Sequence, residues 1–132
     1  MQVPAKKKIL FIDDEESVLY SMSKILSLLG FNVVAMQSST EALASFRKEP
    51  THFDIVVTDH NMPQLTGYDM AKQFLEIRPD IPIILYTACS SEFTPEKVKK
   101  TGIKELLIKP VSAQELAGVI NRILEPVQCK TV

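Results

Sequence analysis

The chain has 132 residues, of which 45% are hydrophobic and 23% are charged, and its formal net charge is −1. A chain of this length is expected to form one domain that folds without a disulfide or a structural metal. The near-neutral charge does not point to direct nucleic-acid binding, and no apolar run approaches the roughly 18 residues of a membrane span. The cysteines, Cys89 and Cys129, lack metal-ligand spacing, and no signal peptide is visible, so we expect a cytoplasmic protein or a cytoplasmic part of a larger one.

Strand-like and helix-like segments alternate along the chain, which predicts an α/β fold with a mainly parallel sheet. The strands are predicted at residues 8–12, 31–36, 55–58, 83–86 and 105–108. A helix-like segment follows each strand, and the last helix is predicted at residues 112–124. One domain is expected at residues 7–125, with flexible termini at residues 1–6 and 126–132.

Capping residues mark the ends of several predicted helices. Ser39 or Thr40 is expected to cap the second helix, and Ser112 with Glu115 forms a capping box at the start of the last one. Gly102 is expected to end the fourth helix. These signals support the alternating order of strands and helices.

The predicted fourth helix, around residues 96–101, differs from the others in its hydrophobicity. Val98 is its only large apolar residue. Such a helix is either weakly anchored and able to shift or simply an ordinary exposed helix, and the sequence leaves both possibilities open.

Polar side chains follow four of the predicted strands at the point where each strand ends. Asp13 and Asp14 follow the first strand, Asp59 the third, Thr87 the fourth and Lys109 the fifth. Because the carboxyl ends of parallel strands meet at one edge of a sheet, these groups are expected to lie together. A single aspartate after a strand is often only a turn residue, but the joint pattern is much more specific.

Three carboxylates without a histidine or thiolate suit Mg2+ or Mn2+ better than zinc. Asp59 is the predicted nucleophile because it stands alone after the central apolar strand, whereas the doublet of Asp13 and Asp14 suits metal ligation. Lys109 is expected to neutralise charge on a transferred phosphoryl group, and Thr87 to donate a hydrogen bond to it.

In these motifs the chain resembles the receiver domain of two-component response regulators. The resemblance is to chemotaxis-type receivers, standing alone or taken from a hybrid histidine kinase, and it runs from about Lys7 to Leu124. The matching segments are residues 9–15, 57–63, 65–67, 86–88 and 108–110. It implies a doubly wound, flavodoxin-like fold with a five-stranded parallel sheet of order 2-1-3-4-5 and five helices.

The resemblance also implies a role for each site residue. Asp59 would accept a phosphoryl group from the phosphohistidine of a histidine kinase or phosphotransfer protein. Mg2+ would be held by Asp13, Asp14 and Asp59, together with the backbone carbonyl of Asn61.

In such a domain Thr87 would move toward the phosphate and Lys109 would pair with it. The Lys109–Pro110 bond would be cis. The domain would assist its own phosphorylation and dephosphorylation without being a turnover enzyme. It would signal to a downstream protein target, as a monomer or as a phosphorylation-dependent dimer.

One position departs from the family pattern. Receivers often carry Tyr or Phe three residues before the lysine, where this chain has Leu106. We therefore hypothesise that the output signal travels through the loop after Thr87 and the fourth helix. Two further expectations are that His60 faces solvent and that Cys89 is a small, semi-buried thiol.

Two other classes of function are weighed against this one. A Mg2+-dependent phosphatase that forms an aspartyl phosphate would use Asp59 and a second acid two residues later, where this chain has Asn61. A receiver-like scaffold would bind a partner without being phosphorylated. Turnover of a small phosphomonoester would support the phosphatase, and failure to accept a phosphoryl group would support the scaffold.

Overall fold

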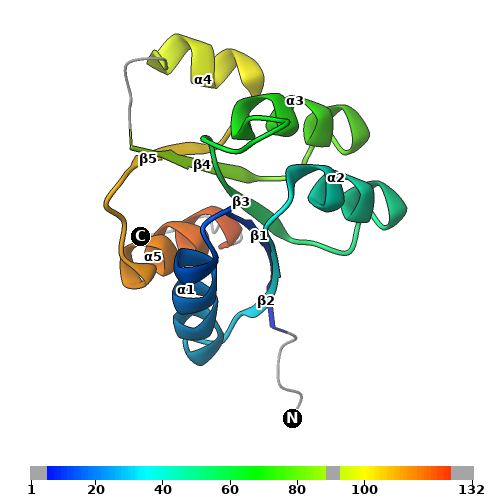
Figure 1. The fold of residues 1–132 in the computed structure, drawn as a ribbon. Coiled ribbons are helices and arrows are strands. Elements are labelled where there is room, and N and C mark those ends of the chain that lie inside the picture. Colours follow the sequence, from blue (N-terminus) through cyan, green and yellow to red (C-terminus); the bar gives the residue numbers. More distant parts are fainter. Residues whose placement is uncertain (1–5, 89–92, 126–132) are drawn as a thin grey trace, which may run out of the picture.

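The structure, a computed structural model, describes residues 6–88 and 93–125, so the expectations for Cys89, Cys129 and the terminal residues 1–5 and 126–132 lie outside it. Its centre is a parallel sheet of order β2-β1-β3-β4-β5 (Figure 1). The strands are β1 (Lys8–Ile12), β2 (Asn32–Met36), β3 (Ile55–Asp59), β4 (Ile83–Thr87) and β5 (Glu105–Ile108). This confirms the predicted strand order.

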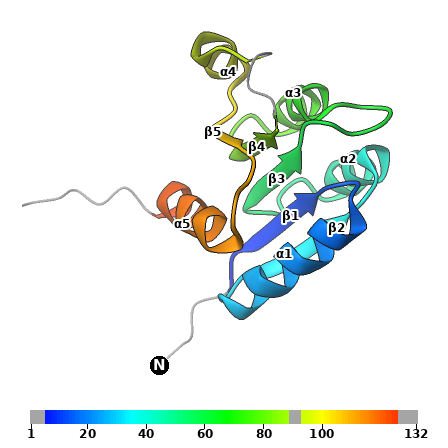
Figure 2. The same ribbon diagram turned by 60° about the vertical axis from the view of Figure 1, so that its left-hand side comes forward.

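Helices cover both faces of the sheet, as the predicted doubly wound fold requires. The helices are α1 (Glu16–Leu28), α2 (Ser39–Lys48), α3 (Gly67–Ile77), α4 (Pro95–Thr101) and α5 (Ala113–Leu124). Helices α1 and α5 lie on one face, and α2, α3 and α4 lie on the other (Figures 1 and 2). None of the helices in the described ranges is long and apolar enough to span a membrane.

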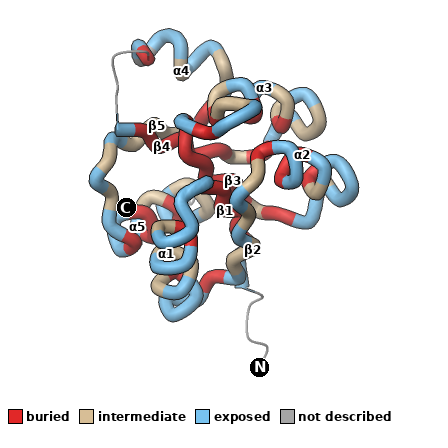
Figure 3. Tube along the Cα trace, in the orientation of Figure 1, coloured by how far each residue is buried: buried red, intermediate tan, exposed pale blue. Residues whose placement is uncertain are grey.

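The sheet separates two hydrophobic cores. Strands β3 and β4 are buried along their whole length, and the red tube in Figure 3 follows them through the centre of the molecule. Side chains alternate along a strand, so Ile84 and Tyr86 face the core under α1 and α5, whereas Ile83 and Leu85 face the core under the other helices. Burial on both faces explains why these strands are continuously apolar.

The helix ends follow the predicted capping signals with one correction. Ser38, not Ser39 or Thr40, caps α2, because its hydroxyl accepts a hydrogen bond from the Glu41 N–H at 3.2 Å. Ser39 is already the first residue of the helix, and its hydroxyl donates to the Pro63 carbonyl. The capping box at the start of α5 is present as predicted.

Helix α4 has the local signals of a helix but a small hydrophobic contact. Thr94 caps it by accepting from the Lys97 N–H, and Gly102 ends it with a φ of 96° in the left-handed region. Among the described side chains of α4, Val98 is the one that packs against the core. The hydrophobic anchoring of α4 by its own side chains is therefore small.

Candidate functional site

The carboxyl ends of β1, β3, β4 and β5 bring the predicted site residues to one edge of the sheet. Asp13 follows β1 directly, Asp59 ends β3, and Thr87 ends β4. Backbone hydrogen bonds hold these ends in register, since the Lys109 N–H donates to the Thr87 carbonyl at 2.8 Å. The predicted meeting of strand ends is therefore present in the fold.

Three carboxylates form what we call the acidic cluster, defined by Asp13, Asp14 and Asp59. Each contributes an oxygen, and these oxygens lie within 4.8 Å of one another. Asp13 and Asp59 are buried, whereas Asp14 is exposed. The donor set consists of oxygen alone and carries several negative charges at short range, which fits a hard divalent cation such as Mg2+.

The carboxyl group of Asp59 has a raised pKa. Burial raises the pKa of its carboxyl above the ordinary value, and the nearby charge of Asp13 raises it further. The ammonium of Lys109, 3.4 Å from Asp59 Oδ2, and the N–H of Asn61, 3.4 Å from Oδ1, oppose this rise in pKa. Burial has a larger effect on the pKa than these two groups, so the ionised form of Asp59 is destabilised. A bound cation would stabilise that form.

Gly67, the first residue of α3, brings the end of β3 and the following loop together. Its N–H donates to the His60 carbonyl at 2.9 Å. A Cβ atom at this position would lie 2.3 Å from the Asp59 carbonyl oxygen and 2.9 Å from the His60 Cα, so only glycine fits without a shift. The loop between β3 and α3 is thereby packed directly against the backbone of Asp59.

His60 is buried, which contradicts the expectation that it faces solvent. Its ring lies nearly perpendicular to that of Phe93, with centroids 4.8 Å apart, and its Nδ1 accepts from the Tyr68 N–H at 3.4 Å. Phe93 comes from the segment just before α4, far away in the sequence. A contact of that kind leaves no signal in the neighbourhood of His60, so the sequence could not reveal it.

Tyr86 is a site residue that sequence reasoning missed. Its hydroxyl donates a hydrogen bond to Oδ2 of Asp13, and the Lys109 ammonium lies 5.0 Å from the centre of its ring. Burial, followed by the hydrogen bond to Asp13, raises the pKa of the phenol. A signal existed, because a tyrosine at the end of a buried apolar strand needs a partner for its hydroxyl.

Thr87 and Leu106, the two positions expected to take part in signalling, both lie in the described part of the chain. Thr87 is buried at the end of β4. Leu106 is half-buried and packs against the hydrophobic core under α2, α3 and α4. The Lys109–Pro110 peptide bond is cis, as the family resemblance implied.

This geometry combines three carboxylates that suit a hard cation with an ammonium group beside the buried one, Asp59. Together they can accept a phosphoryl group, because the cation and the ammonium neutralise the charge on its oxygens. Comparison with known proteins shows which family the chain belongs to.

Several proteins with similar sequences are regulators. The probable transcriptional regulator ycf27 of Porphyridium aerugineum is 36% identical over 122 residues, which cover 92% of this chain and 50% of that protein. The transcriptional regulatory protein ZraR of Escherichia coli is 32% identical over 116 residues, covering 88% of this chain and 26% of that protein. The chain therefore spans about half the length, or less, of these curated relatives.

Solved structures with the same fold include isolated receivers. A response regulator receiver domain protein from Clostridium thermocellum gives a TM-score of 0.82 at 36% identity and covers 88% of this chain and 92% of its own. The chemotaxis response regulator CheY4 of Vibrio cholerae gives a TM-score of 0.78 at 29% identity, covering 90% and 99%. The sequence profile of the response regulator receiver domain matches residues 9–121, so the chain belongs to this family of phosphoacceptor domains of two-component systems.

Proposed function

We propose that Asp59 is the phosphoacceptor of this receiver domain and that the donor is a phosphohistidine of a histidine kinase or phosphotransfer protein. One observation carries the assignment. The buried Asp59 carboxylate lies within the acidic cluster and 3.4 Å from the ammonium of Lys109. It thus has both a place for a cation and a fixed positive charge beside it.

In the proposed step a carboxylate oxygen of Asp59 attacks phosphorus. The new P–O bond forms as the P–N bond to the donor imidazole breaks, and the imidazole leaves with that electron pair and takes up a proton. Lys109 stays close to the oxygens of the transferred group, and the hydroxyl of Thr87 donates a hydrogen bond to one of them. The product is an aspartyl phosphate on this chain.

Receiver domains bind Mg2+ at an acidic pocket, and the acidic cluster of this chain fits that ion. We infer that Asp13, Asp14 and Asp59 hold it, with the backbone carbonyl of Asn61 as a further ligand. When bound, Mg2+ supplies positive charge for the phosphoryl oxygens. The residues of this chain supply the orientation, since both oxygens of Asp13 accept hydrogen bonds from the protein.

We infer further that the output signal passes through Phe93 and α4. Leu106 stands where receivers often carry an aromatic residue, and a leucine cannot rotate between buried and exposed positions as an aromatic side chain does. An aromatic cluster, defined by His60, Phe93 and Tyr68, supports this path. His60 is next to Asp59 and contacts Phe93, whose ring centroid lies 5.7 Å from that of Tyr68. The hydroxyl of Thr101 in α4 donates to the Tyr68 hydroxyl at 2.9 Å.

Receiver domains interact with kinases, phosphotransfer proteins and downstream targets. For this chain we propose a cytoplasmic location, a downstream protein target, and either a monomer or a dimer that forms on phosphorylation. The domain assists its own phosphorylation and dephosphorylation and is not a turnover enzyme.

Intact-mass measurement after incubation with acetyl phosphate and Mg2+ tests the acceptor. Wild type is expected to gain one phosphoryl group, and Asp59→Asn to gain none because the nucleophilic oxygen is lost. Asp69→Asn, which alters an exposed acid of α3, is the matched control and should react as wild type does. Absence of any gain in wild type, from acetyl phosphate or from a phosphohistidine donor, would instead support the scaffold.

A further inference from the structure

We propose that Tyr86 is a positioning residue that orients Asp13 for the cation and supports the ammonium of Lys109. The inference deepens the proposed function, because it rests on Mg2+ binding at the acidic cluster. Tyr86 is the penultimate residue of β4, directly before Thr87. Tyr86 pairs with Asp59 across the sheet, so the two are neighbours at the carboxyl edge.

The hydroxyl end of Tyr86 controls the orientation of Asp13. Asp13 is fully buried, so its carboxylate depends on the protein for hydrogen bonds. Oδ1 accepts from the Glu15 N–H at 2.9 Å, and Oδ2 accepts from the Tyr86 hydroxyl. Donors on both oxygens fix the rotation of the carboxylate, and groups that orient metal ligands in this way contribute to metal affinity.

The ring of Tyr86 contacts the ammonium group of Lys109. The Lys109 ammonium lies 5.0 Å from the ring centre and 3.4 Å from Asp59 Oδ2. The negative face of an aromatic ring attracts an ammonium group at this distance. One side chain therefore touches a predicted metal ligand with its hydroxyl and the counter-charge with its ring.

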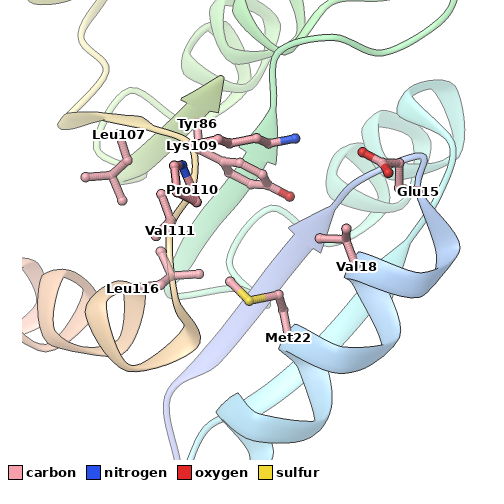
Figure 4. Close-up of a pocket in the computed structure, with 9 residues that line it drawn as sticks. All are labelled: Glu15, Val18, Met22, Tyr86, Leu107, Lys109, Pro110, Val111 and Leu116. Atoms are coloured by element: carbon pink, nitrogen blue, oxygen red, sulfur yellow. The ribbon is translucent and has the colours of Figure 1, made fainter. Parts of the chain in front are cut away.

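Most side chains that line the cavity beside Tyr86 are apolar, and Glu15 and Lys109 are the charged ones among them. The ring forms a wall of a largely apolar cavity of about 390 Å³ between α1 and the segment from β5 to α5 (Figure 4). On that side lie Met22, Val111 and Leu116, whose side chains carry no hydrogen-bond donor. Figure 4 shows the Tyr86 hydroxyl directed away from them and toward the start of α1.

Tyr86→Phe separates the two roles, because it removes the hydroxyl and keeps the ring under Lys109. We expect the dissociation constant for Mg2+, measured by NMR titration of backbone amides at residues 13–15, to rise about tenfold or more. Tyr20→Phe makes the same chemical change on an exposed tyrosine of α1 and is the matched control. Thermal unfolding without Mg2+ checks that each variant is folded.

A Mg2+ affinity of folded Tyr86→Phe within twofold of wild type would overturn the proposal. So would an equal loss in Tyr20→Phe. Asp13→Asn separates this failure from that of the proposed function. If wild type binds Mg2+ and Asp13→Asn does not, the metal site stands and only the role of Tyr86 is lost. If wild type binds no Mg2+, both proposals fail.

A measurement on the wild-type protein keeps the proposal falsifiable if Tyr86→Phe does not fold. With tyrosine labelled with ¹³C at Cζ, saturation with Mg2+ is expected to shift the signal of Tyr86, because its hydroxyl bonds to a carboxylate of the metal site. The signal of exposed Tyr20 should stay in place. An unchanged Tyr86 signal at saturating Mg2+ would overturn the proposal.

Discussion

At the scale of single residues, the site depends on carboxylates held where water cannot stabilise their charge. Asp59 is 2% exposed and Asp13 is fully buried, and each repels the other when both are ionised. Lys109 offsets part of that repulsion from the side, without cancelling the effect of burial on the pKa of Asp59. The proposed phosphoacceptor is therefore also a residue whose charge destabilises the fold.

The raised pKa of Asp59 predicts how folding stability changes with pH. In the range between the ordinary pKa of 3.8 and the raised one, the folded state binds more protons than the unfolded state. The favourable contribution of protonated Asp59 is therefore complete below the unfolded pKa and is lost as the pH rises through the folded pKa. Asp59→Asn, which stays neutral, should be more stable than wild type at neutral pH without Mg2+, and this difference should shrink as the pH falls.

Urea unfolding in Mg2+-free buffer between about pH 4 and pH 8 measures this difference in the free energy of unfolding. Glu76→Gln, which neutralises an exposed acid of α3, is the control and should show no comparable gain. A gain for Asp59→Asn that did not vary with pH would contradict the assignment of the effect to the charge of Asp59.

At the scale of elements, the entry into α3 is the tightest junction of the site. Gly67 is buried against the last residue of β3 and against His60. The absence of a side chain at this position lets α3 begin in direct contact with the end of β3. The position of α3 and the position of Asp59 are thus coupled by direct backbone contact.

Gly67→Ala should therefore destabilise the protein by about 1–3 kcal/mol, because the new methyl group would overlap backbone atoms that cannot rotate away. Gly118→Ala in α5 is the matched control, since a Cβ atom there meets nothing within 4 Å. That change should stabilise the protein by about 0.5–1 kcal/mol, as expected for glycine in a helix interior. Chemical denaturation of the two variants measures both effects, and equal effects would contradict the packing argument.

At the scale of the whole molecule, the site at the sheet edge is connected to α4 by side chains from separate parts of the chain. The aromatic cluster joins the residue after Asp59 to the N-terminal side of α3 and to the segment before α4. Lys97 of α4 also lies 4.9 Å from the Tyr68 ring centre and 5.5 Å from that of Phe93. These contacts add to the small hydrophobic contact of Val98.

We expect phosphorylation of Asp59 to change the environment of Phe93 and α4 through the aromatic cluster. With a phosphate mimic such as beryllofluoride and Mg2+, backbone amide signals of residues 93–101 should shift, because a change beside Asp59 reaches Phe93 through His60. Phe93→Leu, which keeps an apolar side chain but removes the ring, should reduce these shifts while the signals of residues 13–15 still move. Shifts confined to the edge of the sheet in wild type would contradict this path.

The sequence patterns predicted a parallel sheet, the alternation of its elements and the groups at its edge, and the resemblance to receiver domains implied the strand order. Continuous apolar runs predicted buried strands at β3 and β4, and each was followed by a polar residue. Since parallel strands share one carboxyl edge, Asp13, Asp59 and Lys109 had to converge once the strand order was known. That inference needed only the strand positions and the topology.

Only the tertiary structure decided which neighbours these groups have. Tyr86 and Asp13 are separated by 73 positions, yet the hydroxyl of one bonds to the carboxylate of the other. His60 is buried because Phe93, from a different strand–helix connection, lies against it. Strand and capping signals are local, whereas these contacts depend on side-chain directions across several strands, and no pattern within either segment encodes them.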